Sequence, residues 1–280
     1  MLEKELETAC SLARQAGAAM MKFYDTDLLI NEKFADDNFA EPVTAADHAS
    51  NDVIIAGLSE AFPGDGILSE ETPDDQARLN KNRVWIIDPL DGTKGFINHD
   101  GDFAVQIGLA ENGAPLLGVV YLPFEDVLYH AVRGEGSWMT SRDGTEPMAV
   151  SNKTDFAEMN LAVSRDHRSP RMSRIFEHMG LKSETGRGSV GLKVGLIARR
   201  VCDLYLHLSP RTKFWDTCAP QIILEEAGGR MTDLFGYPLS YDIAEVRNLN
   251  GVVATNGAAH DVVIETLKPM LLEFGRVRVE

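Results

Sequence analysis

Cysteine is scarce in this chain of 280 residues, which contains only Cys10, Cys202 and Cys218. Their odd number and the lack of any CxxC pair exclude a disulfide framework and a thiolate zinc site. No apolar run approaches the ~20 residues needed to span a membrane. The opening MLEKELETACSLARQAG also lacks the basic-then-apolar order of a secretory signal. We therefore expect a cytoplasmic protein without membrane partners.

Positive charge is also in short supply. The chain has 27 Lys and Arg residues against 43 Asp and Glu residues, which gives a formal net charge of −16. Such an acidic surface repels phosphate backbones, so we expect no nucleic-acid partner. A small anionic substrate remains compatible with this charge, provided that metal ions reverse its sign locally.

Apolar residues, in contrast, are plentiful enough for a sizeable core. Hydrophobic residues make up 44% of the chain and charged residues 25%. This composition excludes wholesale disorder, and the length suits one large domain or two closely packed lobes. Hydrophobic periodicity predicts an opening amphipathic helix over residues 2–24 and a second helix that begins at Thr44. The polar stretch 25–41 between them predicts a loop or weak structure.

Strands are predicted next. Val84–Ile87 has the pattern of a short buried strand that Asp88-Pro89 should end. The alternating residues that follow, with an Asn112-Gly113 turn, predict an antiparallel meander. The polar stretch Thr140–Pro147 is the best candidate boundary. We therefore predict a mixed α and β protein with an N-terminal α+β lobe (1–147), which carries the metal-binding motif, and a C-terminal α/β lobe (148–280) that completes the site.

The densest group of chemically active side chains is the segment Asp88–Thr93, with the sequence DPLDGT. It follows a buried strand, where sheet proteins commonly build ligand sites. Asp88 and Asp91 stand three residues apart around a proline and can converge on cations. Gly92 permits a close approach of backbone, and Thr93 can begin a short helix whose N–H groups suit a phosphate. Each dipeptide alone usually marks only a turn, but both turns directly after a buried strand favour a site.

Three further acids could complete a metal site. Glu70 follows a short apolar run, Asp47 lies one turn beyond Thr44, and Asp216 begins a predicted helix. Each has a simpler interpretation: a solvated surface pair for Glu70, helix-dipole compensation for Asp47 and an N-cap for Asp216. Oxygen ligands without His or Cys point to Mg²⁺ or Mn²⁺ rather than zinc.

One motif is misleading. Gly186-x-Gly188-x-x-Gly191 matches the dinucleotide fingerprint. However, Lys182–Thr185 before it does not have the pattern of a buried strand, and Asp203 comes too early to bind a ribose. A dinucleotide-binding oxidoreductase is therefore a minor alternative, which a titration with NAD would expose.

Taken together, the motifs resemble those of the inositol monophosphatase-like superfamily. The resemblance rests on residues 85–93 (WIIDPLDGT), on Glu70-Glu71 and on Trp215–Pro220. Within the superfamily, the chain is most similar to the 3'(2'),5'-bisphosphate nucleotidases, through Ser209–Pro220, Asp91–Lys94 and Ser164–His167. The resemblance covers most of the chain. It implies an α/β sandwich of alternating helix and sheet layers.

The resemblance also implies an activity. That activity is Mg²⁺-dependent hydrolysis of a small phosphomonoester, with two or three ions per site, inhibition by Li⁺ and compatibility with a homodimer. Asp47 and Thr93 would orient and deprotonate the attacking water. The implied metal ligands are Glu70, Asp88, Asp91, Asp216 and the carbonyl of Leu90. The implied substrate contacts are Gly92, Thr93, Ser164, His167, Ser189 (where a Gly is expected) and Lys193.

Two rival functions remain open from the sequence. The first is phosphatase activity of the same superfamily on inositol phosphate, histidinol phosphate or a sugar phosphate. The second is a non-catalytic nucleotide or metal sensor. A sensor needs the metal carboxylates but has no use for a water activator, so the presence of both Asp47 and Thr93 favours an enzyme.

Overall fold

The structure, a computed structural model, describes residues 2–26, 31–34, 40–165 and 169–280. Within these residues the chain forms two larger sheets, a two-stranded ribbon and seven α-helices. The helices are α1 (Glu3–Met21), α2 (Ala45–Ala61), α3 (Thr93–Ile97), α4 (Pro170–Met179), α5 (Val190–Ala198), α6 (Phe214–Glu226) and α7 (His260–Glu273). None of these helices combines the length and apolar composition needed to cross a membrane.

The first sheet has seven strands in the order β3-β4-β5-β6-β7-β8-β9. Its first pair is parallel and the others are antiparallel, which confirms the predicted meander. Asn112 and Gly113 both have positive φ, as a tight hairpin turn between β5 and β6 requires. The strands are β3 (Gly66–Ser69), β4 (Arg83–Asp91), β5 (Ala104–Glu111), β6 (Ala114–Leu122), β7 (Val127–Val132), β8 (Ser137–Ser141) and β9 (Gly144–Pro147).

The second sheet has five strands in the order β11-β10-β12-β14-β13. It is mixed, because β10 pairs in parallel with β11 and β12 while β14 runs antiparallel to its two neighbours. The strands are β10 (Asn160–Ser164), β11 (Ser183–Arg187), β12 (Leu204–His207), β13 (Arg230–Thr232) and β14 (Val252–Thr255). β11 is an edge strand with mostly exposed residues, so the segment before Gly188 is indeed not a buried strand.

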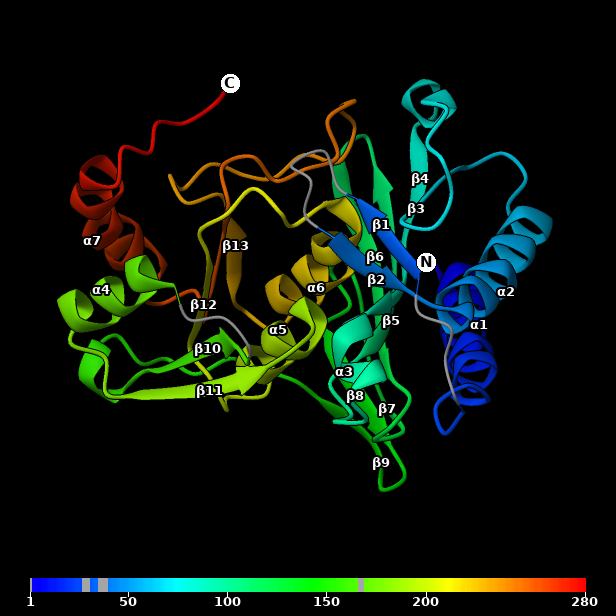
Figure 1. Cartoon of the computed structure of the whole chain (residues 1–280), viewed down its shortest axis with the longest axis horizontal. Helices are drawn as coiled ribbons and strands as arrows, with labels where there is room; N and C mark the ends of the chain where they lie inside the picture. The colour runs from blue at the N-terminus through cyan, green and yellow to red at the C-terminus, as the bar shows by residue number, and fades with distance from the viewer. Residues whose placement is uncertain (1, 27–30, 35–39, 166–168) are drawn as a thin grey trace.

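Helix and sheet layers alternate through the molecule (Figure 1). Helices α1 and α2 cover one face of the seven-stranded sheet, and α5 and α6 lie between the two sheets. Helices α4 and α7 cover the outer face of the five-stranded sheet. The predicted layered α/β fold is confirmed. The division at residue 147 stays a prediction, although β9 ends there; α6 from the second half packs directly on β5 and β6 of the first.

Two local predictions differ from the structure. The stretch 25–41, predicted as a loop or weak structure, includes strand β1 (Asn31–Phe34) and the start of β2 (Ala40–Val43), which pair antiparallel. Strand β4 does not end at Asp88-Pro89 but continues to Asp91. A proline tolerates this position because the ladder is interrupted there by a shift of register between Asp88 and Asp91.

Candidate active site

Three carboxylates meet where α6 packs against the end of β4. Asp88 and Asp91 lie on β4, and Asp216 lies in the first turn of α6. One carboxylate oxygen of each residue lies within 4.8 Å of the others. Asp88 is 1% exposed and Asp91 is 9% exposed. The structure therefore brings together three of the predicted metal ligands from distant parts of the sequence.

The register shift in β4 explains how two of these carboxylates share one side. Asp88 pairs with Gln106 and Asp91 pairs with Ala104, so β4 has one residue more than β5 over this interval. In a regular strand, residues three apart point to opposite faces. The extra residue of a β-bulge re-aims the side chains that follow it. Asp88 and Asp91 can therefore converge on the same point.

Asp91 is held firmly through one of its oxygens. Its Oδ2 accepts hydrogen bonds from Gln106 Nε2 on β5, from Ser189 Oγ, and from the backbone N–H groups of Val190 (2.8 Å) and Gly191 (3.3 Å). The last three donors form the N-terminus of α5, an environment that favours a negative charge. All four donors reach Oδ2. No donor among the described residues reaches Oδ1, which leaves that oxygen for a cation.

Asp47 combines a structural bond with a bond to the site. It is the third residue of α2, and its Oδ2 accepts from the backbone N–H and the hydroxyl of Thr44, both at 2.7 Å. Its Oδ1 accepts a hydrogen bond of 3.2 Å from Thr93 Oγ1. The predicted pair of Asp47 and Thr93 is thus in contact. The same hydroxyl lies 3.3 Å from the carbonyl oxygen of Leu90, the predicted backbone ligand.

Asp216, like Asp47, is the third residue of its helix, α6. Its Oδ2 accepts a hydrogen bond from the backbone N–H of Lys213, three residues earlier. The prediction of Asp216 as the N-cap was wrong, because Lys213 is the N-cap and Asp216 is the third residue of α6; its carboxylate nevertheless caps the helix through this bond. A capping bond to one oxygen fixes the rotamer of the side chain and directs its carboxylate toward Asp88 and Asp91.

The electrostatics of the cluster are those of a cation site. Burial raises the pKa of Asp216 well above its usual value, and the negative charges of Asp91 and Glu70 raise it further. Burial also raises the pKa of Asp91, opposed by its bond from Ser189 and by the charge of Lys193. Glu70, directly after β3, is therefore close enough to act on both. A set of repelling carboxylates without His or Cys fits Mg²⁺ or Mn²⁺.

A cavity of about 400 Å³ is lined in part by Lys94, the residue that follows Thr93 in the sequence. Lys94 and Arg211 line it with positive charge, and Ser164, Ser209 and His207 line it with hydrogen-bonding groups. His207 is held from both sides, because its Nδ1 lies 3.0 Å from the Tyr205 hydroxyl and its Nε2 lies 2.8 Å from Ser209 Oγ. The cavity can take a small polar molecule that carries negative charge.

Only some of the predicted substrate contacts lie at this cavity. Ser164 lines the cavity, Gly92 stands before α3 with φ of 97°, and His167 lies outside the described residues. Ser189 and Lys193 are buried and do not line this cavity. Ser189 donates to Asp91. Burial lowers the pKa of Lys193 to about 8, against the opposing charges of Asp91 and Asp216, and its Nζ donates to the carbonyl of Gly188 at 2.8 Å. Their roles toward substrate stay predictions.

Sequence reasoning overlooked three residues of the site. Gln106 and Asp102 were not singled out, nor was Arg211, although it lies within the quoted segment Ser209–Pro220. Gln106 carried a usable signal, because it is a lone amide inside an otherwise apolar strand. Its alternation with Val105 and Ile107 indicated a solvent-facing side chain, but α6 covers that face and Gln106 is fully buried.

Comparison with known proteins places this geometry in context. The Inositol monophosphatase family profile matches residues 1–271. The 3'(2'),5'-bisphosphate nucleotidase CysQ of Escherichia coli (strain K12) is 37% identical over 246 residues, covering 84% of this chain and 93% of its own. The inositol-1-monophosphatase of Bacillus subtilis (strain 168) is 30% identical over 267 residues, covering 92% and 94%.

Solved structures show the same fold. The CysQ of Bacteroides thetaiotaomicron, described as a bacterial member of the inositol monophosphatase family, superposes with a TM-score of 0.76 at 28% identity, covering 91% of this chain and 97% of its own. The IMPase of Thermotoga maritima superposes with a TM-score of 0.80 at 25% identity, covering 97% and 100%.

Proposed function

The chain belongs to the inositol monophosphatase family and is a phosphatase; on this premise we propose that it hydrolyses the 3'(2')-phosphate of adenosine 3'(2'),5'-bisphosphate to AMP and phosphate. The observation that carries the chemistry is the convergence of Asp88, Asp91 and Asp216 beside the hydrogen-bonded pair Asp47 and Thr93. The substrate is proposed from the similarity to the CysQ nucleotidases, which exceeds that to the inositol-1-monophosphatase.

The carboxylates are the residues that would hold Mg²⁺, with Glu70 and the carbonyl of Leu90 as further ligands. Bound Mg²⁺ neutralises phosphoryl oxygens and lowers the pKa of water. The repulsion that raises the pKa values of Asp91 and Asp216 is relieved when cations are present. The four donors to Asp91 Oδ2 keep that carboxylate in one orientation, so the ligand set is formed before substrate arrives.

Thr93 and Asp47 are proposed to handle the proton of the attacking water. The Thr93 hydroxyl donates to Asp47 Oδ1, which leaves its oxygen lone pairs available to accept from a water molecule. As the water attacks phosphorus, Thr93 can take the water proton and pass its own proton to Asp47. The bonds from Thr44 to Oδ2 hold the Asp47 carboxylate in place for this transfer.

The charge of the cavity supports a substrate with a second anionic group. Lys94 and Arg211 line the cavity in a protein whose formal net charge is −16. These two positively charged side chains, in an otherwise acidic protein, suit a second phosphate group in addition to the one that is hydrolysed. Inhibition by Li⁺, a homodimer and a cytoplasmic location stay predictions.

A substrate panel tests the proposal. We expect kcat/KM to be highest for adenosine 3',5'-bisphosphate, and at least tenfold lower for inositol 1-phosphate and histidinol phosphate, with release of free phosphate as the readout in Mg²⁺ buffer. A preference for inositol 1-phosphate or histidinol phosphate would replace the nucleotidase assignment with that activity. Absence of phosphate release from every monoester would overturn the catalytic assignment of Asp47 and Thr93.

A further inference from the structure

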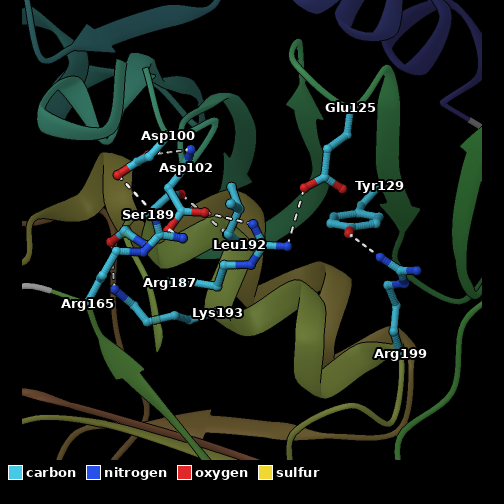
Figure 2. Close-up of polar contacts among 11 residues, drawn as sticks. Asp100, Asp102, Glu125, Tyr129, Arg165, Arg187, Ser189, Leu192, Lys193 and Arg199 are labelled. Atoms are coloured by element: carbon cyan, nitrogen blue, oxygen red, sulfur yellow. Dashed lines mark hydrogen bonds and ion pairs between the residues drawn. The ribbon is translucent and has the colours of Figure 1, made fainter. Parts of the chain in front are cut away.

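A fully buried carboxylate outside the acidic cluster is held by two arginines (Figure 2). Asp102 lies between α3 and β5 and is 0% exposed. Its Oδ1 lies 2.7 Å from Arg187 Nη1, and its Oδ2 lies 2.6 Å from Arg165 Nη2. Arg187 ends β11 and Arg165 directly follows β10, the paired neighbour of β11. Asp102 therefore joins the loop after α3 to the ends of two strands of the other sheet.

The main chain of Asp102 is wedged between two segments of the site. A Cβ atom at Gly92 would lie 2.4 Å from the Asp102 carbonyl oxygen, and a Cβ atom at Gly188 would lie 2.9 Å from the same oxygen. Both approaches are closer than a side chain permits. Gly92 directly precedes Thr93, and Gly188 directly precedes Ser189. A shift of Asp102 would therefore displace both segments.

The turn at Gly188 links Asp102 to the acidic cluster. The Gly188 N–H donates to Asp102 Oδ2 at 2.8 Å, and its carbonyl accepts from Lys193 Nζ at 2.8 Å. The next residue, Ser189, begins α5 and donates its hydroxyl to Asp91 Oδ2. Ser189, which holds Asp91, therefore directly follows a residue whose N–H is bound by Asp102.

We propose that Asp102 is a positioning residue of the phosphatase reaction, which orients the metal ligand Asp91 through the Gly188–Ser189 turn. Arg165 and Arg187 place positive charge against both oxygens of this buried carboxylate. An amide at residue 102 cannot replace the carboxylate, because its nitrogen would face either Arg187 or the donors Arg165 and Gly188. This inference rests on the proposed metal-dependent function, since it assigns Asp91 to a cation.

The test measures Mn²⁺ binding to the substrate-free protein by electron paramagnetic resonance of the free ion, alongside steady-state kinetics. We expect Asp102→Asn to weaken Mn²⁺ binding about tenfold, as loss of a supporting group around a metal ligand commonly does. We expect kcat to fall while KM changes less than twofold, because Asp102 does not line the substrate cavity. Far-UV circular dichroism and the melting temperature without metal establish that the variant is folded.

The matched control is Glu125→Gln. Glu125 contacts the same arginine, with Oε1 3.3 Å from Arg187 Nη2, but it has no bond to Gly188. We expect its Mn²⁺ affinity and kcat to equal those of the wild type. A folded Asp102→Asn protein with wild-type Mn²⁺ affinity would overturn the inference, and so would equal losses in Glu125→Gln. A wild-type protein without Mn²⁺ binding or phosphatase activity would instead overturn the proposed function.

A second variant covers the case in which Asp102→Asn does not fold. Arg187→Gln leaves the carboxylate paired with Arg165 and bonded to Gly188. We expect about threefold weaker Mn²⁺ binding in this variant, because one of the two charges that hold Asp102 is gone. Unchanged Mn²⁺ affinity in folded Arg187→Gln would then overturn the inference.

Discussion

The aspartates of the site use their two oxygens for different purposes. In Asp47 and Asp216, Oδ2 caps the helix on which the residue lies. In Asp91, Oδ2 accepts from β5 and from the start of α5. One oxygen thus fixes the rotamer, and the other is available for the chemistry. A capping role and a site role are therefore not alternatives for these residues, as the sequence already allowed for Asp216.

Asp88 is the residue whose loss should affect turnover most. We predict that Asp88→Asn lowers kcat by about three orders of magnitude, because removal of a cation ligand costs roughly 4 kcal/mol of transition-state stabilisation. In the wild-type protein, Asp88 Oδ1 accepts a hydrogen bond of 3.1 Å from the Leu90 N–H, and the amide oxygen of the variant can accept the same bond. Removing one charge from a repelling cluster should leave the melting temperature without metal unchanged or slightly higher.

Asp143→Asn, on the exposed turn between β8 and β9, is the control for this experiment. The measurements are kcat at saturating Mg²⁺ and calorimetric melting in chelator. A kcat near the wild-type value would contradict the assignment of Asp88 to a cation.

Helix α6 brings Asp216 to the site only because the sheet beneath it has glycines at the contact. A Cβ atom at Gly118 on β6 would lie 2.4 Å from the carbonyl oxygen of Ala219. At Gly108 on β5, it would lie 2.7 Å from Cys218 Sγ. The backbone of α6 therefore rests directly on the sheet. The position of Asp216 relative to Asp88 depends on this close packing.

We predict that Gly118→Ala destabilises the protein by about 1–3 kcal/mol, the usual range for forced overpacking. Because the contact is with backbone, α6 must move, and we expect kcat to fall as Asp216 is displaced. Gly64→Ala is the matched control, because a Cβ atom there meets nothing within 4 Å. Urea unfolding and kcat should be measured for both variants. Wild-type stability and turnover in Gly118→Ala would show that α6 adjusts without moving Asp216.

The acidic cluster joins the two halves of the molecule, since Asp88 and Asp91 come from the first sheet and Asp216 from α6. Without metal, their repulsion acts across this junction. The pKa values of Asp91 and Asp216 are raised in the folded protein. The folded protein therefore binds these protons more tightly than the unfolded chain does. The resulting contribution to the free energy of unfolding is fully present below the unfolded pKa of about 3.9, and it is lost as the pH rises through the raised pKa values.

Magnesium should reverse this loss, because it binds the ionised carboxylates. We predict that Mg²⁺ raises the melting temperature of the wild-type protein, by an amount set by its concentration relative to its dissociation constant. The increase should be larger at pH 8 than at pH 5. It should be much smaller in Asp216→Asn, which removes one ligand. Calorimetric scans with Mg²⁺ or with chelator, at both pH values, are the measurement; an increase that is equal at the two pH values would contradict the predicted linkage.

Local sequence signals determined much of this protein. Thr44 with Asp47 marked the start of α2, Asn112-Gly113 marked a hairpin, and the segment Asp88–Thr93 marked a site after a buried strand. Each signal acts within a few residues, where capping geometry, turn conformation and side-chain period leave few choices. Residues 85–93, Glu70-Glu71 and Trp215–Pro220 together also indicated the family.

Only the tertiary structure decided how these parts face one another. The tertiary structure alone decides the bulge that turns Asp88 and Asp91 to one side and the burial of Gln106 beneath α5 and α6. It also decides the bonds from Ser189 to Asp91 and from Lys193 to Gly188. Asp102 shows the reason most clearly: its partners Arg165 and Arg187 lie more than sixty residues away along the chain. The alternation of residues within a strand determines which residues share a face of the sheet, but the packing of other layers on the sheet determines whether that face is buried.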